Sequence, residues 1–289
     1  MIPSLPRPVW LRAATVAYLV AFLAFLFLPL AVVAVFAFND APYPAPPWRG
    51  FTLDWFVGNA ALGRTGLFAD SELMGSIWTS CIVALCVTAL SALIGTTNAF
   101  LLERSRFLGK QALSIMMLAP LVIPGVILGI SILAFASRIA DFADDAFGLE
   151  LDFLRPGLPL VVLGQFSYIA TIATLTISAR LRRFDRTLEE AALNLGASKA
   201  AVFRTILLPY LRPALLGSAA ISFLMSFADF NTTLMLVGAD TPLTVMMYGR
   251  MREGATPVLN AVSLFLMIAS AVLALSLLKR GGPRTKPAE

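Results

Sequence analysis

Residues 188–209 read LEEAALNLGASKAAVFRTILLP and lie in the most basic loop of an otherwise apolar chain. Thr187 precedes this stretch, and Glu190 follows Thr187 by three residues, a capping-box spacing that predicts the start of a helix. Apolar residues then recur at positions i, i+3, i+4 and i+7 from Leu188, as on one face of an amphipathic helix. Gly196 can adopt the left-handed conformation that commonly ends a helix. The first half of the stretch therefore predicts a short helix that ends near Gly196.

A second helix is predicted directly after this glycine. Ser198 is a favourable N-cap residue, and the apolar residues that follow it again have helical spacing. Pro209 has no backbone N–H, so we expect this helix to end near it. The stretch thus predicts a helix–glycine–helix element with small alanines on its exposed face, where the backbone of a partner protein can approach closely. An amphipathic hairpin lying on a membrane surface is the alternative.

The composition indicates that a lipid bilayer is the main solvent of this chain. Hydrophobic residues make up 58% of its 289 residues and charged residues 13%, with a mean hydropathy of +0.83. A soluble domain has about a quarter of its residues charged. The net charge of +5 comes from basic residues that flank apolar stretches, so no nucleic-acid partner is expected. The chain has no histidine, which removes the usual general base and metal ligand, and no metal site is expected.

Six apolar stretches are long enough to cross a bilayer, which takes about 20 residues. Asp229 is the only formal charge inside them. In the third stretch, residues 118–125 read LAPLVIPG and are expected to break the helix near its middle. This break either borders a translocation path or is a structural kink. The six predicted spans are 13–38, 77–102, 112–137, 157–179, 213–237 and 255–278.

The distribution of Lys and Arg predicts which segments are cytoplasmic. The termini and the loops 103–111 and 180–212 hold 16 of these residues, whereas the segments 39–76, 138–156 and 238–254 hold 6. Cytoplasmic loops are enriched in Lys and Arg, so both termini and loop 180–212 are expected on the cytoplasmic side. The predicted organisation is a cytoplasmic N-terminus (1–12), a first span (13–38), an outer segment (39–76), a core domain (77–279) and a cytoplasmic tail (280–289).

The outer segment begins with a proline-rich turn and continues as FTLDWFVGNAAL, which predicts a short amphipathic helix at the membrane interface. Its aromatic residues suit that depth, because the rings of Trp and Tyr favour the headgroup region. Docking of a partner protein is the alternative explanation. The aromatic residues in question are Trp48, Phe51, Trp55 and Phe56.

The loop motif resembles the "EAA" loop of ABC importer permeases, through Glu190-Ala191-Ala192, Gly196 and the terminal Leu208-Pro209. The resemblance extends from about residue 71 to the C-terminus. It implies an all-α membrane protein with six transmembrane helices and the type I ABC importer permease (MetI-like) fold. It also implies that this loop contacts the ATPase subunit. The ATPase-coupling residues that it implies are Glu190, Ala191, Ala192, Gly196, Ala197, Leu208 and Pro209.

The resemblance further implies two ABC ATPase subunits, a second permease subunit, giving a heterodimer, and a periplasmic or lipid-anchored substrate-binding protein. The chain has no G-x-x-x-x-G-K-[ST] motif to bind ATP phosphates, so ATP-Mg is expected in the partner ATPase subunits and no cofactor in this chain. Residues 226–230, 242–245 and 254–261 are most similar to the second permease of polyamine-type importers. The implied solute is a polyamine or related amino compound, with an amino-acid derivative or a phosphonate as the alternative.

Asp229 is a candidate residue of the solute pathway. A lone carboxylate in a span costs roughly 2.5–3.5 kcal/mol, so it must contact water, a partner or a substrate. It either attracts a cationic solute or bonds to neighbouring backbone or to Arg250 or Arg252, and the sequence leaves both interpretations open. The candidate pathway residues are Asp229, Asn231, Thr232 and Thr233.

Two other functional classes fit the sequence less well. An ion-coupled secondary transporter is expected to have several carboxylates within its spans, and this chain has one. An intramembrane enzyme needs a nucleophile with a base, or metal ligands, at membrane depth. The chain is therefore expected to be a permease subunit and not an enzyme.

Overall fold

The structure is a computed structural model that describes residues 9–254 and 256–281. Within these ranges the regular structure is helical and contains no strand. Six described helices are long and apolar enough to cross a membrane, which agrees with the predicted number. These helices are Val9–Phe36, Ser71–Arg104, Gly125–Phe147, Leu158–Leu181, Lys199–Ala228 and Val258–Ser276.

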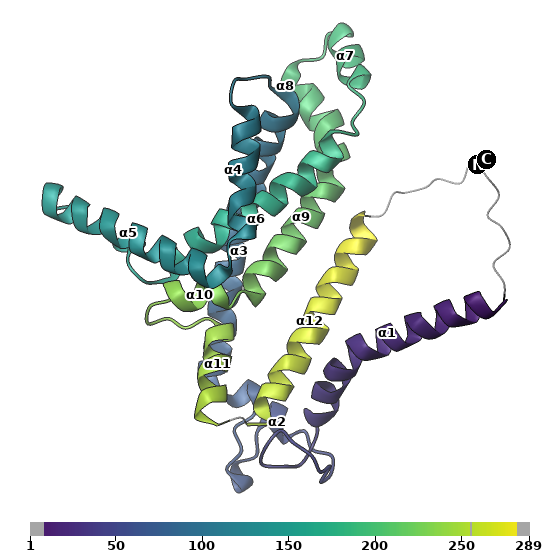
Figure 1. Ribbon diagram of the computed structural model, residues 1–289, viewed down its shortest axis with the longest axis vertical. Helices are drawn as coiled ribbons and strands as arrows, with labels where there is room; N and C mark the ends of the chain where they lie inside the picture. Colours follow the sequence, from purple (N-terminus) through teal and green to yellow (C-terminus); the bar gives the residue numbers. More distant parts are fainter. Residues whose placement is uncertain (1–8, 255, 282–289) are drawn as a thin grey trace. The chain divides into compact units, whose positions relative to one another are not determined.

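The chain forms two compact units. Figure 1 labels the helices of both units. Unit 1 comprises the described parts of Met1–Ser71 and Arg250–Ile268, and unit 2 comprises Glu72–Gly249 and the described part of Ala269–Glu289. Most of the predicted tail, 280–289, lies outside the described residues, as does most of the predicted N-terminal segment, 1–12. Unit 1 contains α1 (Val9–Phe36), α2 (Asp54–Val57), two 3-10 turns (Ala60–Leu62 and Leu67–Ala69) and the first part of α12 (Val258–Gly281).

Unit 2 contains the remaining elements, and α11 runs from unit 2 into unit 1. They are α3 (Ser71–Arg104), α4 (Lys110–Val122), α5 (Gly125–Phe147), a 3-10 turn (Asp152–Leu154), α6 (Leu158–Leu181), α7 (Thr187–Asn194), α8 (Lys199–Val202), a π-helical turn (Phe203–Leu207), α9 (Leu208–Ala228), α10 (Asn231–Leu236) and α11 (Leu243–Glu253).

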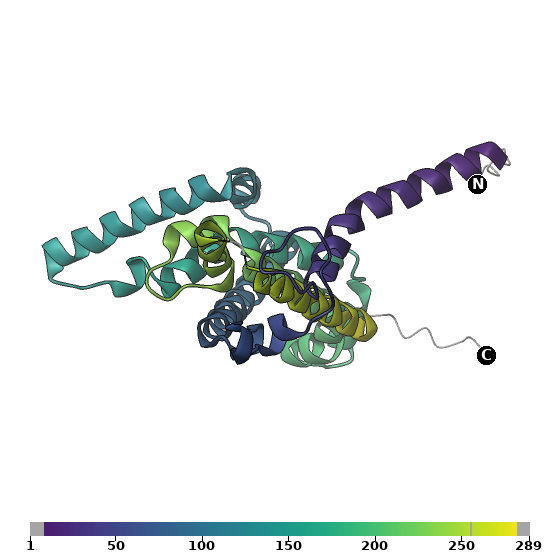
Figure 2. The same cartoon turned by 90° about the horizontal axis from the view of Figure 1, so that it is seen from below.

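The predicted third span is two separate helices. Ile123 is extended and Pro124 begins the next segment, so α4 ends at Val122 and α5 begins at Gly125. Pro124 has no N–H and disfavours helical geometry in the residue before it. Figure 2 shows α4 end-on and α5 lengthwise, so the chain turns sharply at the break. The break was predicted, but α5 then continues to Phe147, beyond the predicted end of the third span at residue 137.

The short helix α10 packs closely against α5 and α6 because these helices present glycines to it. A Cβ atom on Gly129 of α5 would lie 2.8 Å from Met235 Cβ, and one on Gly125 would lie 3.0 Å from Asn231 Cβ. A side chain on Gly164 of α6 would collide with Leu236. Gly125 and Gly129 thus form a GxxxG pair, a spacing that allows close helix contact in membranes.

Apolar side chains complete the contact between these helices. Leu236 of α10 is fully buried in a cluster with residues of α3, α5 and α6. A helix of six residues is marginal by itself, so its stability depends on this packing. The other buried members of the cluster are Val83, Val87, Ala136, Leu160, Val161 and Ile169.

Substitution of Gly129 by Ala tests this packing. The new methyl group would require α10 to move, because the nearest atoms are Cβ and Cγ of Met235, followed by the Thr232 backbone oxygen. We expect a loss of about 1–3 kcal/mol of stability, typical of overpacking, measured as a lower thermal unfolding midpoint in detergent. Gly217→Ala in α9 is the matched control, because a Cβ there meets no described atom within 4 Å. Equal stability of the two variants would contradict the proposed role of Gly129.

Candidate functional site

The loop between α6 and α9 contains α7, which begins at Thr187 as predicted, but the predicted capping box is wrong. Asp185 Oδ1 accepts hydrogen bonds from the Thr187 backbone N–H (3.0 Å) and the Thr187 hydroxyl (2.8 Å). The Glu190 backbone N–H donates instead to the Arg186 carbonyl at 3.1 Å, so the pairing expected between Thr187 and Glu190 does not form. An acceptor two residues before the helix, such as Asp185, is not part of the capping-box pattern.

The same contacts change the titration of Asp185, which lies in the loop outside the spans. The Thr187 backbone N–H and then its hydroxyl stabilise the carboxylate and lower the pKa of Asp185 from its ordinary value. A lowered folded-state pKa means that ionised Asp185 stabilises the start of α7 above its unfolded-state pKa. This contribution is lost as the pH falls through the lower, folded-state pKa.

Gly196 ends α7 as predicted. Its φ is +88°, and the Ala197 N–H donates to the Ala192 carbonyl at 3.0 Å, which closes the helix end. The Ser198 hydroxyl then accepts from the Ala201 N–H at 3.2 Å, so the predicted second cap is confirmed. The predicted stop at Pro209 is wrong.

The helix passes through Pro209 without a stop. From Lys199 the chain is helical to Ala228, through a π-helical turn at Phe203–Leu207 that leads directly into α9. Pro209 occupies one of the first two positions of α9, where the absence of an N–H is tolerated. The motif therefore runs directly into a candidate transmembrane helix.

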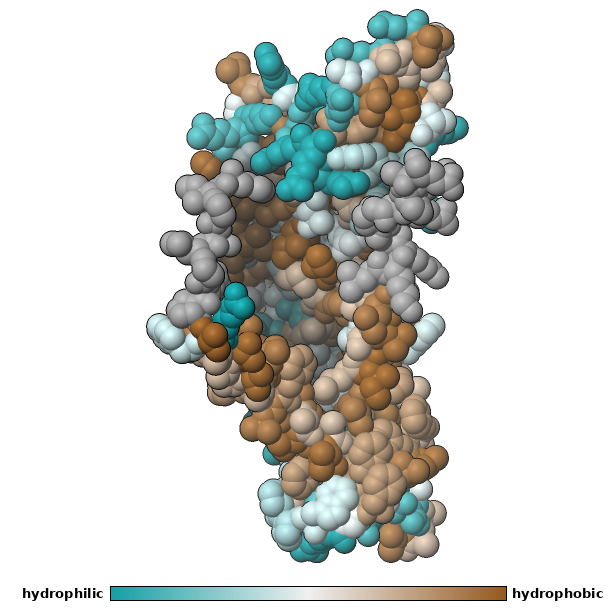
Figure 3. Space-filling view, turned by 90° about the vertical axis from the view of Figure 1, so that its right-hand side faces the viewer, coloured by the Kyte–Doolittle hydropathy of each residue, from teal (hydrophilic) through white to brown (hydrophobic). Residues whose placement is uncertain are grey.

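The loop exposes the residues that its motif singles out. Glu190, Ala191, Gly196, Leu208 and Pro209 are exposed, and Ala192 and Ala197 are partly exposed. The Glu190 side chain has no hydrogen bond or ion pair within the described residues, and the apolar Leu195 is 89% exposed. Figure 3 shows hydrophilic residues gathered at the end of unit 2 that carries α7 and α8. The loop thus presents a mixed polar and apolar surface without a partner in this chain.

Ion pairs hold the loop against the last turn of α3. Arg104 of α3 forms a two-point contact with Glu189 of α7, at 2.6 and 3.2 Å, and its guanidinium also lies over the Phe184 ring. The neighbouring Glu103 accepts from Arg182 at 2.8 Å. Sequence reasoning selected Glu190 and missed Glu189, which makes the ion pair. The adjacent charged residues Glu103 and Arg104, at the end of a predicted span, could have indicated an ion-pair partner in the loop.

A second candidate site lies where α9 ends and α10 begins. Asp229 is extended at this break and is partly buried. One carboxylate oxygen accepts from the Thr233 N–H (2.9 Å) and hydroxyl (2.8 Å), and the other accepts from the Tyr168 hydroxyl at 3.0 Å. Local backbone and hydroxyl contacts thus stabilise the carboxylate. Arg250, one of the two arginines considered as its partner, instead pairs with Asp70 at 2.5 Å.

Gln165 of α6 ties both sides of this break together. Its side-chain N–H donates to the Thr233 hydroxyl at 2.8 Å, and its side-chain oxygen accepts from the Ser226 hydroxyl. Gln165 is 1% exposed, so a missing partner would leave a buried amide group unsatisfied. The sequence analysis did not select Gln165 or Tyr168, although each is a polar residue within a predicted span.

A cavity of about 260 Å³ opens beside the break, bordered by α4, α5, α6, α9 and α10. Asp229, Asn231 and Thr232 line it, together with Tyr168. Thr233 does not line the cavity and instead belongs to the buried network with Gln165. The structure thus brings three of the four candidate pathway residues to one cavity.

Gln165→Leu is expected to destabilise unit 2. The substitution leaves the buried Ser226 hydroxyl without its acceptor, at a cost of about 1–3 kcal/mol, while the Thr233 hydroxyl keeps its bond to Asp229. The thermal unfolding midpoint of the purified protein measures the effect. Gln111→Leu is the matched control, because Gln111 lies exposed on α4. A Gln165 variant as stable as the control would rule out a structural role for the network.

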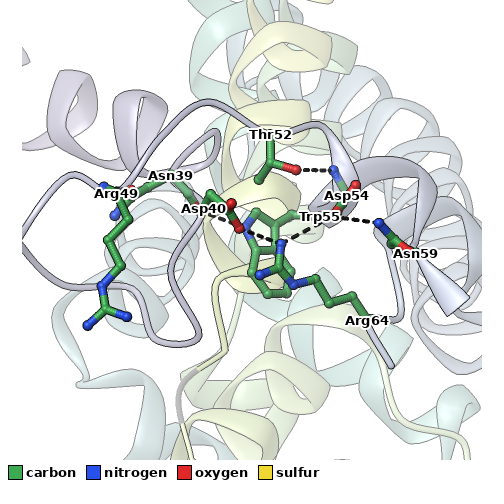
Figure 4. Close-up of polar contacts among 8 residues, drawn as sticks. All are labelled: Asn39, Asp40, Arg49, Thr52, Asp54, Trp55, Asn59 and Arg64. Atoms are coloured by element: carbon green, nitrogen blue, oxygen red, sulfur yellow. Dashed lines mark hydrogen bonds and ion pairs between the residues drawn. The ribbon is translucent and has the colours of Figure 1, made fainter. Parts of the chain in front are cut away.

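The outer segment is folded around Trp55 and Arg64 (Figure 4). The predicted amphipathic helix is only one turn, α2, because Gly58 with a φ of +87° ends it. Trp55 was expected at the membrane interface but is 5% exposed, and its ring nitrogen donates to the Asn39 carbonyl at 2.8 Å. Arg64 lies over the Trp55 ring and pairs with Asp40 at 2.6 Å and with Asp54 at 3.1 Å.

A cavity of about 480 Å³ adjoins this cluster in unit 1. Arg64, Asp70 and Arg250 contribute charges to its wall, and each of them pairs with another residue of the same unit. The cavity therefore has charged walls whose charges are balanced within the unit.

Comparison with known proteins identifies the family. Residues 91–279 match the family model "Binding-protein-dependent transport system inner membrane component". The chain belongs to this family. It is therefore a multi-pass inner-membrane permease subunit of a binding-protein-dependent ABC importer and not an enzyme.

Curated relatives match along most of their length. The chain is 30% identical over 251 residues to the putrescine transport system permease protein PotI of Escherichia coli (strain K12), covering 86% of this chain and 84% of PotI. It is 27% identical over 258 residues to the spermidine/putrescine transport system permease protein PotC of Haemophilus influenzae, covering 89% of this chain and 92% of PotC.

Solved structures show the same fold. A chain from a bacterial alginate ABC transporter in complex with an alginate pentasaccharide-bound periplasmic protein matches with a TM-score of 0.73, at 18% identity, over 97% of this chain and 96% of that chain. A chain of the MetNI methionine ABC transporter matches with a TM-score of 0.55, at 17% identity, over 73% of this chain and 94% of that chain. The predicted MetI-like, all-α permease fold is confirmed.

Proposed function

We propose that this chain forms half of the transmembrane pathway for a polyamine or a related small amino compound. The observation that carries the proposal is the 30% identity to a putrescine permease over 86% of this chain. A spermidine/putrescine permease of another organism matches over a similar share. An amino-acid derivative or a phosphonate is the alternative solute.

In this proposal the energy for transport comes from two partner ATPase subunits, which hold ATP and Mg²⁺. The loop 180–212 would lie in the cytoplasm and contact one of them. Glu190, Ala191, Ala192 and Gly196 would lie at this contact, since they are exposed or partly exposed. Ala197, Leu208 and Pro209 would border it. Leu188, Leu193 and Leu195 of the loop are all exposed, which supports a protein contact, because apolar residues gathered on a surface favour protein partners.

The complete importer would further contain a second permease subunit and a periplasmic or lipid-anchored substrate-binding protein. A relative in structure comes from a transporter in complex with a periplasmic protein, which supports the second of these partners. One loop of this type in each permease supplies one contact for each of two ATPases, which supports a second permease subunit; a paralogous partner would make the pair a heterodimer. Both termini would then be cytoplasmic, as the excess of Lys and Arg favours.

The solute would pass the break between α9 and α10. Asp229, Asn231 and Thr232 line the cavity there, and Thr233 supports them through its bonds to Asp229 and Gln165. A carboxylate in this position favours a cationic solute, in agreement with the substrates for which the putrescine and spermidine/putrescine permeases are named.

Uptake by the reconstituted importer tests the proposal. The chain is purified with its partner subunits, placed in liposomes with ATP inside and supplied with the binding protein and radiolabelled putrescine outside. ATP-dependent accumulation of putrescine is the expected result. Accumulation of a phosphonate or a neutral amino-acid derivative, with no uptake of putrescine or spermidine, would refute the polyamine assignment.

Gly196→Val is expected to abolish most uptake while the protein still inserts into the membrane. A β-branched residue at a φ of +88° is strained by roughly 1–2 kcal/mol, and the loop surface changes with it. Gly196→Asn is the matched variant, because Asn adopts the left-handed conformation more readily and should retain more uptake. ATP-dependent uptake and co-purification of the ATPase are measured together. A Val variant that assembles and transports normally would show that Gly196 has no role in coupling.

The ion pair between Arg104 and Glu189 is expected to position α7 for its partner. Arg104→Glu and Glu189→Arg each place two like charges together, so either change should reduce uptake and ATPase co-purification. The double variant restores opposite charges at the two positions and should recover a large part of both signals. Arg183→Glu is the control, because Arg183 is exposed in the same loop and has no ion pair within the described residues. Absence of recovery in the double variant would argue against this positioning role.

A further inference from the structure

The helix α11 contacts the break between α9 and α10 with one of its faces. Thr244 lies in the first turn of α11, and its hydroxyl donates to the Asp229 carbonyl at 2.8 Å. One turn later, the centroid of the Tyr248 ring lies 5.0 Å from that of the Phe230 ring. Residues four apart share one face of a helix, so Thr244 and Tyr248 present the same face of α11 to the break.

A second face of α11 contacts α3 and the residue before it. The Leu243 N–H donates to the Ser80 hydroxyl of α3 at 2.8 Å, and both residues are buried. Arg250, in the last turn of α11, forms a two-point contact with Asp70, at 2.5 and 3.1 Å. Asp70 directly precedes Ser71, the first residue of α3. Residues seven apart also share a helix face, so Leu243 and Arg250 hold α11 to the start of α3 at two points.

The Thr244 bond supports the break itself. In an unbroken helix the Thr233 N–H would donate to the Asp229 carbonyl, but here it donates to the Asp229 carboxylate at 2.9 Å. The carbonyl accepts instead from the Thr244 hydroxyl. An unpartnered carbonyl is costly inside a membrane, so α11 stabilises the bent course of the chain at Asp229.

The Arg250–Asp70 pair is partly protected from solvent. The Arg250 side chain is 24% exposed and the Asp70 side chain 12%, so salt screens this pair less than a surface pair. Loss of one charge from a protected pair is more damaging than loss of a surface ion pair, because the other charge is left without that partner. A helix of 11 residues is marginal by itself, so the position of α11 depends on such contacts.

We infer that α11 is a positioning element of the solute pathway, which fixes the Asp229 backbone to the start of α3 through Thr244 and Arg250. Neither of these two residues lines the cavity beside the break, so they act through Asp229, whose side chain does line it. The inference rests on the proposed function, because the break is taken to border the solute pathway. It assigns to the Arg250–Asp70 pair control over the geometry of a cavity that the pair does not line.

Hydrogen–deuterium exchange of the chain, purified with its partner subunits, tests this linkage without transport. Arg250→Asp places two carboxylates together and should release α11, so the amides of residues 231–237 should exchange about tenfold faster. The amides of α7 are the internal reference and should keep their rate, because other ion pairs hold α7. Arg49→Asp is the matched control and should have no effect, because Arg49 is exposed and has no ion pair within the described residues.

Rescue variants separate positioning from general damage. Arg250→Asp combined with Asp70→Arg restores opposite charges and should recover most of the slow exchange at residues 231–237. Thr244→Val removes the bond to the Asp229 carbonyl and should speed this exchange by about fivefold. Thr244→Ser keeps a hydroxyl at the same position and should retain the slow rate.

The reconstituted importer gives a second readout. Arg250→Asp and Thr244→Val should each lower the amount of solute accumulated for each ATP hydrolysed by several fold, because the pathway is misplaced while the ATPase contact is intact. A loss of folded protein would lower uptake and hydrolysis equally and leave this ratio unchanged. The charge-exchanged double variant should recover the ratio.

Four results would overturn the inference. They are equal exchange at residues 231–237 in Arg250→Asp and Arg49→Asp, faster exchange in α7 as well, no recovery in the double variant, and an unchanged ratio of uptake to hydrolysis. If the unsubstituted importer accumulates another solute and no putrescine, the proposed solute is refuted, and the exchange rates with the ratio for that other solute still decide the role of α11.

Discussion

The hydrogen bonds of Gln165 join α6 to both sides of a break in the chain, and much of unit 2 depends on them. The break between α9 and α10 leaves backbone N–H and C=O groups without helical partners and places the Asp229 carboxylate beside them. Inside a membrane each unsatisfied polar group is costly. Gln165 supports Thr233, and Thr233 in turn donates to Asp229. The short helix α10 is thereby held between α5 and α6, and the cavity beside Asp229 exists because the chain bends there.

The two candidate sites differ in how they are held. The loop around α7 is fixed by charged groups at its base and leaves its motif residues exposed. The α9–α10 break is fixed by buried neutral groups and close glycine contacts. Salt weakens the more exposed Arg182–Glu103 pair more than the partly buried Arg104–Glu189 pair, and it weakens buried hydrogen bonds least. The break is thus the more rigid of the two sites.

Local patterns predicted the elements that are set by near neighbours in sequence. The glycine end of α7, the Ser198 cap and the break after α4 all follow from residues within a few positions. The errors have a common physical origin in contacts that local patterns do not contain. Trp55 is buried because Arg64 lies over its ring and the Asn39 carbonyl accepts its ring N–H. The helix continues through Pro209 because a π-helical turn leads into α9. Gln165 was missed because its partners lie more than sixty residues away.

The helix α3 runs without a break for 34 residues, from Ser71 to Arg104, and its last turn is the part that pairs with the loop. At 1.5 Å per residue it is a rod of about 50 Å. A rod converts a small rotation at one end into a large displacement at the other, and a tilt of about 10° moves the far end by about 9 Å. Because the last turn of α3 pairs with α7, a displacement of α7 would tilt a helix that is long enough to cross the whole bilayer.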